Sequence, residues 1–181
     1  TLENLKEIIM TLETCEAPEI RLSMTEGVYF RNLNGNEAKD VLEITKGMGG
    51  ENDFEQSVSC IGVPTCQIGV CDSQASLREM ISYVKENNGA TEYLPKVYFS
   101  GCGNSCGVHE IGAIGFMGKM KRVDGQLLES FELYIDGSYK EKEARLAEKY
   151  GEILGRDIPK FILELSNMLK DNNIGFLEYI K

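Results

Sequence analysis

Four of the six cysteines in this chain form two close pairs, and this spacing constrains the fold more than any other feature. Cys60 and Cys66 have five residues between them, Cys102 and Cys106 have three, and thirty-five residues separate the pairs. Glycine or proline interrupts each pair, so we expect loops in which thiols and backbone N–H groups turn toward one point. Thiolate sulfur is a soft ligand, and four together predict zinc or an iron–sulfur cluster.

The surroundings of the pairs favour the cluster over zinc. Zinc ribbons usually place cysteines about two to four residues apart, which only the second pair satisfies. Apolar, glycine-rich loops suit a cluster, because burial and N–H donors to sulfur tune its potential. Four buried, unliganded cysteines are the plain alternative, and disulfides suit small secreted chains rather than one of 181 residues. Cys15 and Cys71 stand outside both pairs and are interpreted as packed thiols.

Composition and charge exclude several classes of function. Apolar residues make up 42% and charged residues 27%, which is typical of a folded globular chain. The formal charge of −10 disfavours nucleic acid and anionic membranes as partners. The acidic, periodic segment 1–16 is not a signal peptide, and the first residue is Thr1. We therefore expect a processed chain or an excised fragment in a reducing compartment, the cytoplasm.

The hydrophobic pattern predicts an α+β protein in two parts, divided near the glycine-rich linker 48–53. The first part is expected to contain helix 2–13, strands 19–24 and 27–31, and helix 37–46. The second is expected to form a mixed β-sheet flanked by helices, with both cysteine loops at one end. Its predicted elements are helix 73–87, with a capping box that favours a start near Ser76, strands 96–100, 111–117 and 131–135, and helices 141–154 and 158–170.

Four segments resemble the nitrite and sulfite reductases that contain siroheme and a 4Fe–4S cluster. Residues 60–66, 100–107 and 114–118 match the family's two cysteine loops and its glycine strand, and 19–26 resembles its ferredoxin-like half-domain. The resemblance implies a half-domain over 1–50 and a 4Fe–4S and siroheme-binding domain over 51–181. Such reductases contain two copies of this unit, and this chain resembles the cysteine-bearing copy, usually the carboxy-terminal one.

The resemblance also implies roles for individual residues. Cys60, Cys66, Cys102 and Cys106 are expected to ligate the 4Fe–4S cluster, with Cys106 also bridging to the siroheme iron. Arg21 is the candidate for contacting a siroheme carboxylate; the alternative is an ordinary exposed strand arginine. Asn104 is expected to donate an N–H group to the cluster sulfurs; the alternative is that asparagine simply tolerates a left-handed turn.

The chain departs from the family pattern at several positions. Gly103 replaces the usual proline, Glu26 the glutamine of the half-domain signature, and Ser23 its threonine. The family binds its oxyanion with arginine and lysine from the other copy, and no comparable cluster occurs here. The basic residues within 119–122 are interpreted as a solvated loop, and His109 as packed or solvent-facing. The catalytic residues are therefore not identified.

These features predict the cluster-bearing fragment of a siroheme-dependent six-electron reductase, inactive alone. Reduction of nitrite to ammonia with ferredoxin as donor is favoured, and sulfite to sulfide is the alternative. The expected partners are the remaining repeat of the parent reductase, ferredoxin or another electron donor, and the small oxyanion substrate. Two other classes stay open: an iron–sulfur electron-transfer or sensor module without siroheme, and a zinc-stabilised interaction domain.

Overall fold

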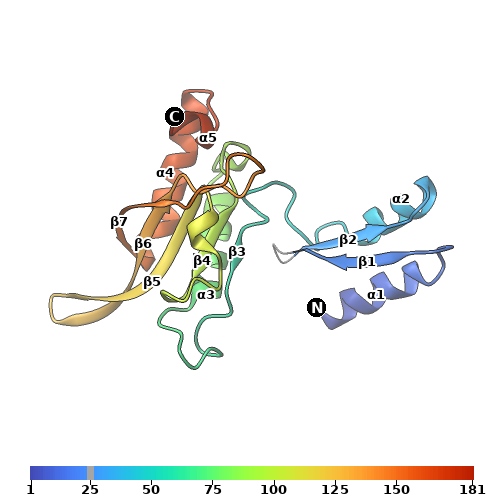
Figure 1. Cartoon of the computed structure of the whole chain (residues 1–181), viewed down its shortest axis with the longest axis horizontal. Coiled ribbons are helices and arrows are strands. Elements are labelled where there is room, and N and C mark those ends of the chain that lie inside the picture. Colours follow the sequence, from blue (N-terminus) through green and yellow to red (C-terminus); the bar gives the residue numbers. More distant parts are fainter. Residues whose placement is uncertain (24–26) are drawn as a thin grey trace. The chain divides into compact units, whose positions relative to one another are not determined.

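The computed structural model describes residues 1–23 and 27–181, which divide into two compact units, Thr1–Glu51 and Asn52–Lys181 (Figure 1). Both units combine helices with strands, and the second contains a mixed five-stranded sheet. The predicted α+β class is confirmed. Glu26, one of the departures from the family pattern, lies outside the described residues. Within the described residues, no helix is long and apolar enough to span a bilayer.

The first unit has the predicted order of helix, strand, strand and helix. Strands β1 and β2 pair antiparallel, and helix α1 packs against α2. An asparagine, Asn34, caps α2 and exchanges hydrogen bonds with Glu37 in a capping box. The bounds are α1 (Leu2–Leu12), β1 (Glu19–Leu22), β2 (Val28–Arg31) and α2 (Gly35–Ile44).

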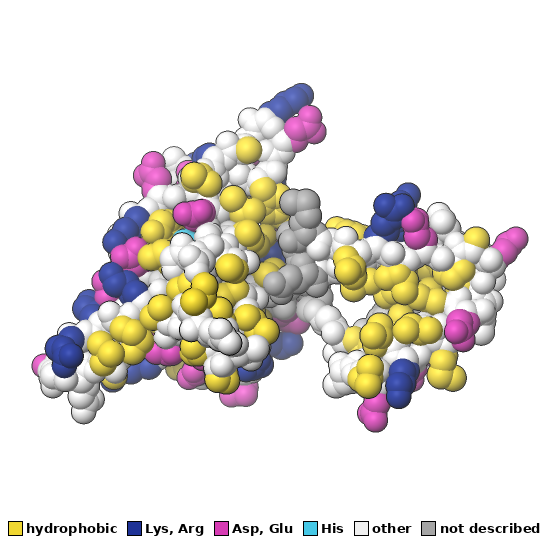
Figure 2. Space-filling model, turned by 60° about the horizontal axis from the view of Figure 1, so that its bottom comes forward, with side chains coloured by type: hydrophobic (Ala, Val, Ile, Leu, Met, Phe, Trp, Pro, Cys, Tyr) yellow, Lys and Arg dark blue, Asp and Glu magenta, His cyan; other side chains and the backbone are white. Residues whose placement is uncertain are grey.

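The first unit covers little of its own apolar surface. Its buried hydrophobic residues, within the described part, are Leu12 and Val41. Figure 2 shows hydrophobic side chains spread over the face that this unit presents. Exposed apolar surface of this extent is typical of a face that packs against another part of a protein. The exposed residues are Leu2, Leu5, Ile9, Met10, Ile20, Leu22, Val28, Tyr29 and Leu42.

The second unit is built on a sheet with strand order β3-β4-β5-β6-β7. The first three strands run parallel, and β6 and β7 continue the sheet antiparallel. The strands are β3 (Val58–Ser59), β4 (Val97–Ser100), β5 (Ile114–Val123), β6 (Gln126–Ile135) and β7 (Glu148–Leu154). The α-helices are α3 (Ser73–Glu86), α4 (Ile158–Asp171) and α5 (Phe176–Tyr179), and short 3₁₀ turns are η1 (Thr91–Tyr93), η2 (His109–Ile111) and η3 (Gly155–Asp157).

One face of this sheet forms the core with α3 and α4. Alternate strand residues point to it, and the rings of Phe99, Phe116 and Phe131 contact one another at centroid distances of 4.7 to 6.4 Å. Helix α3 contributes Met80 and Val84, both fully buried. The connection from β4 to β5, residues 101–113, lies on the opposite face and carries the second cysteine pair.

Two details of the predicted elements are wrong. The helix predicted over 141–154 does not form: residues 141–147 are turn and irregular backbone, and 148–154 are strand β7. The free edge of β6 offers backbone partners to 148–154 that outweigh local helix preference. Helix α3 begins at Ser73 instead of near Ser76. The Asp72 carboxylate accepts the Ala75 N–H at 2.9 Å and caps the helix, while the Ser76 hydroxyl bonds back to the Asp72 carbonyl.

A nearly buried carboxylate on the sheet predicts an acid-sensitive contribution to stability. Glu132 accepts hydrogen bonds from Lys149 at 2.6 Å, Lys119 at 3.0 Å and the Tyr134 hydroxyl at 3.2 Å. Hydrogen bonds from Lys149 and Lys119 hold the pKa of Glu132 at about 2. Since this lies below the ordinary value, the carboxylate stabilises the fold fully above that value, and the contribution is lost as the pH falls toward 2.

Replacing Glu132 with glutamine should therefore lower the free energy of unfolding by about 1–2 kcal/mol at pH 7. The difference from the wild type should shrink steadily below pH 4.5, the ordinary pKa of the group. Urea unfolding at pH 7 and pH 3.5 measures it, with the exposed Glu148→Gln as control. If Glu132→Gln lowered the free energy of unfolding equally at both pH values, the stabilising role of the ionised carboxylate would be contradicted.

Candidate functional site

Both cysteine loops begin where parallel strands end. The first loop, residues 60–72, follows β3, and the second, 101–108, follows β4. Because these strands run parallel, their carboxyl ends meet at one edge of the sheet. Backbone hydrogen bonds join the loops: the Gly101 carbonyl accepts the N–H groups of Val70 at 3.1 Å and Cys71 at 2.9 Å. The structure thus brings the two pairs to the same end of the second unit.

Cys60 lies at the junction of the two loops. Its own N–H donates to the Phe99 carbonyl at 3.0 Å, and its Sγ accepts the Gly101 N–H at 3.1 Å. The Ser73 hydroxyl lies 3.3 Å from the same sulfur. An N–H donor aimed at sulfur tunes the potential of a metal centre bound there.

The other three cysteines of the pairs differ in exposure. Cys66 and Cys102 are half-buried, and Cys106 is exposed. All six thiols of the chain are free. Within residues 1–23 and 27–181, no three Cys, His, Asp or Glu side chains lie close enough together to hold a metal ion. The structure therefore gathers the loops, and the thiols stand apart from one another on them.

A buried hydrogen-bond network supports the second loop from inside. His109 Nδ1 lies 2.9 Å from the Ser100 hydroxyl and 3.3 Å from the Ser105 hydroxyl. The Ser100 hydroxyl also accepts the Gly107 N–H at 3.1 Å. His109 is packed, which agrees with one of the two roles expected for it. Periodicity in the sequence does not predict this support, because the network joins a strand end, Ser100, to residues of the loop and turn that follow it.

Burial lowers the pKa of His109, partly against the charges of Glu110 and Glu132. The unfolded chain then takes up a proton first as the pH falls, so stability is complete above the ordinary pKa of about 6.5 and declines below it. His109 is the chain's only histidine. We expect His109→Gln to remove the loss of stability between pH 7 and pH 5.5, measured by urea unfolding. A decline of equal size in both proteins would contradict the burial argument.

The two unpaired cysteines behave as the packed thiols expected. Cys71 is fully buried, and burial raises the pKa of its thiol to about 12. Its Sγ donates to the Lys119 carbonyl at 3.4 Å. Cys15, in the first unit, is partly buried, and burial raises its pKa as well. Neither thiol is set up as a thiolate ligand.

The two candidate residues outside the cysteines, Arg21 and Asn104, lie in different settings. Arg21 is exposed on β1 and pairs with Glu19, with 2.6 Å between its guanidinium and the carboxylate. Asn104 is exposed in the second loop, where the left-handed conformation belongs instead to its neighbour Ser105, at φ 55°. Asparagine is therefore not required there for a left-handed turn.

The basic residues within 119–122 do not form a loop. They lie on strand β5, where Lys119 pairs with Glu132 and Glu152, and Lys121 also pairs with Glu152. Pairing with β6 over ten residue positions keeps this segment extended. The two lysines therefore pair with carboxylates of the same sheet, while Arg122 donates to the Gly125 carbonyl at 2.9 Å.

Known proteins resemble this chain over most of its length. No family model matches the chain. The NADPH sulfite reductase hemoprotein beta-component of Bacillus licheniformis is 24% identical over 170 residues, covering 87% of this chain and 28% of that protein. The ferredoxin–nitrite reductase of Synechococcus elongatus is 24% identical over 173 residues, covering 91% of this chain and 33% of that protein. Over most of its length, this chain is therefore similar to part of a sulfite reductase and part of a nitrite reductase.

The fold of this chain agrees with a solved structure. The NirA protein of Mycobacterium tuberculosis superposes with a TM-score of 0.74 at 18% identity, over 89% of this chain and 31% of NirA. This likeness shows that the two proteins share a fold, and not only the α+β class. The chain spans about a third or less of the length of each of these relatives.

Proposed function

We propose that this chain is the cluster-bearing portion of a siroheme-dependent reductase. The observation that carries the proposal is the meeting of two cysteine loops at one sheet edge, in a chain related to nitrite and sulfite reductases. The proposed domains are a ferredoxin-like half-domain over 1–50 and a 4Fe–4S and siroheme-binding domain over 51–181. The cytoplasm is the proposed compartment, because free thiols of this kind persist in a reducing environment.

The donor set fits a 4Fe–4S cluster in its chemistry. Cys60, Cys66, Cys102 and Cys106 supply four soft sulfur ligands from loops that are already joined by backbone hydrogen bonds. The Gly101 N–H already donates to one of these sulfurs. Ligation draws the four sulfurs closer than they lie in this structure, and the binding energy of a metal centre commonly orders such loops.

Each remaining candidate has a distinct proposed task. Cys106 is exposed, which suits a thiolate that reaches both the cluster and a siroheme iron beyond this chain. When bound, the cluster and siroheme would supply a route for the donor's electrons and a metal centre for reduction of an oxyanion. Asn104 is proposed to donate N–H groups to the cluster sulfurs. Arg21 is proposed to bind a siroheme carboxylate after releasing Glu19.

The partners follow from the length and surface of the chain. The relatives are about three times as long, so the remaining repeat of the parent reductase is the first proposed partner. The uncovered apolar surface of the first unit suits packing against that repeat. Ferredoxin is the proposed donor and nitrite the favoured substrate, with sulfite as the alternative. One relative is named for each oxyanion.

The test is to express the complete parent protein anaerobically, with siroheme synthesis supported, and to record its absorption spectrum and reductase activity. We expect a Soret-like band with a red feature, and oxidation of a reduced dye that depends on nitrite. A brown protein with cluster absorption alone and no turnover of nitrite or sulfite would identify an electron-transfer or sensor module instead. A colourless zinc protein would exclude both.

A further inference from the structure

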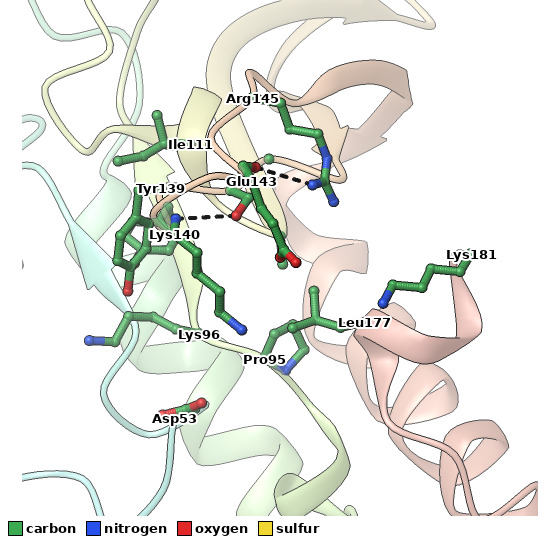
Figure 3. Close-up of a pocket in the computed structure, with 14 residues that line it drawn as sticks. Asp53, Pro95, Lys96, Ile111, Tyr139, Lys140, Glu143, Arg145, Leu177 and Lys181 are labelled. Atoms are coloured by element: carbon green, nitrogen blue, oxygen red, sulfur yellow. Dashed lines mark hydrogen bonds between the residues drawn. The ribbon is translucent and has the colours of Figure 1, made fainter.

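A small cavity lies at the end of the second unit's sheet opposite the cysteine loops. Its volume is about 180 Å³. It is lined by Lys96 just before β4, Ala113 just before β5, and residues 137–140 after β6 (Figure 3). Because β6 runs antiparallel to β5, its end meets the start of β4 and β5, while the cysteines follow the other end of β4. The cavity is therefore separate from the proposed cluster site.

A buried hydroxyl without a partner lines this cavity. Tyr98 is 1% exposed, and its hydroxyl forms no hydrogen bond within the described residues. Leaving such a group unsatisfied costs about 1–3 kcal/mol, so an acceptor supplied by a ligand would be favourable. Burial raises the pKa of Tyr98, and the neighbouring Tyr139 hydroxyl raises it further, so the phenol stays protonated and able to donate.

The charge around the cavity is positive although the chain is acidic overall. Lys96 and Lys140 line it, and within the described residues neither forms an ion pair. Figure 3 shows the Lys140 side chain extending from its loop into the middle of the pocket. The full set of charged lining residues is Lys96, Lys140, Arg145 and Lys181 against Asp53 and Glu143. Arg145 is already paired with Asp136.

We propose that this cavity binds a small oxyanion, with the Tyr98 hydroxyl and the Lys140 ammonium as its principal donors. Two unpaired ammonium groups supply charge, and the buried phenol supplies a directed hydrogen bond. Apolar residues Pro95 and Ile111 close part of the wall. The volume is below the roughly 300–1,000 Å³ of pockets for drug-sized ligands, so an inorganic anion fits better than a nucleotide.

The test is a titration of the ¹⁵N-labelled chain with sodium phosphate, in which the amide chemical shifts are recorded. A parallel titration with sodium chloride at matched ionic strength is the reference. We expect saturable shifts at residues 137–140. Tyr98→Phe should weaken phosphate binding by about tenfold, because it removes a hydrogen bond to a charged group and keeps the ring. Lys140→Met should weaken it by a factor of about three.

Two controls keep the result specific. Lys160→Met removes an exposed lysine on α4, away from the cavity, and should bind phosphate as the wild type does. Thermal unfolding in chloride establishes that each variant is folded. Amide shifts that do not saturate with phosphate would overturn the proposal. An equal loss of phosphate affinity in Lys160→Met and Lys140→Met would overturn it as well. Unchanged phosphate affinity in a folded Tyr98→Phe would overturn the role of the hydroxyl.

Discussion

Gly107→Ala should lower the free energy of unfolding by about 3 kcal/mol or more, among the largest effects expected of a single methyl group in this chain. A Cβ at this position would lie 1.8 Å from the Phe99 carbonyl oxygen and 3.1 Å from the Cys60 nitrogen. Both are backbone atoms, and the same carbonyl accepts the Cys60 N–H. Relief of the clash therefore has to move the strand end at which the two cysteine loops join.

A neighbouring glycine provides the matched control. A Cβ at Gly103 would meet only the Met117 sulfur, at 3.8 Å, which is an ordinary contact. Gly103→Ala should therefore change stability by no more than about 0.5 kcal/mol. Urea unfolding of both variants measures the difference. If Gly107→Ala were as stable as Gly103→Ala, the close packing of the second loop against Phe99 would be wrong.

The second large effect concerns metal content. Replacing any one of Cys60, Cys66, Cys102 or Cys106 with serine should lower cluster incorporation by more than the roughly 10–100-fold that loss of an outer-shell partner costs. Oxygen is a harder ligand than thiolate sulfur, so serine does not substitute for it. Iron bound per chain after anaerobic reconstitution gives the measurement.

Cys15→Ser is the control for this series. It removes a thiol whose sulfur lies 3.6 Å from the Thr11 carbonyl. Cys15 belongs to the first unit, whereas both cysteine loops belong to the second. It should incorporate the same amount of iron as the wild type. If Cys15→Ser and Cys60→Ser lost equal amounts of bound iron, iron would be binding to the thiols non-specifically.

The sequence predicted the features that depend on local pattern and on ligand spacing. Alternation and helical periodicity identified the two parts, and glycine-interrupted cysteine pairs indicated loops. The parallel order of β3 and β4, which places Cys60 beside Gly101, follows from pairing between distant segments and was expected only as loops at one end.

The errors arose where long-range contacts decide local structure. Residues 148–154 have a helix-like composition, but the open edge of β6 makes them a strand. The pattern also gave no indication that Ser100 and His109 would support the second cysteine loop, because that network links a strand end to a turn. Lys119 was expected in a loop, and it lies instead in an ion-pair network on the sheet.

The central claim is that the four paired cysteines bind one 4Fe–4S cluster. Mössbauer spectroscopy, with iron and acid-labile sulfide analysis, tests it on the 181-residue chain after anaerobic reconstitution with ⁵⁷Fe and sulfide. We predict about four iron and four sulfide per chain and a single cubane-type spectrum. Retention of one zinc in preference to iron, or a chain without iron whose six thiols all react with an alkylating reagent, would contradict the claim.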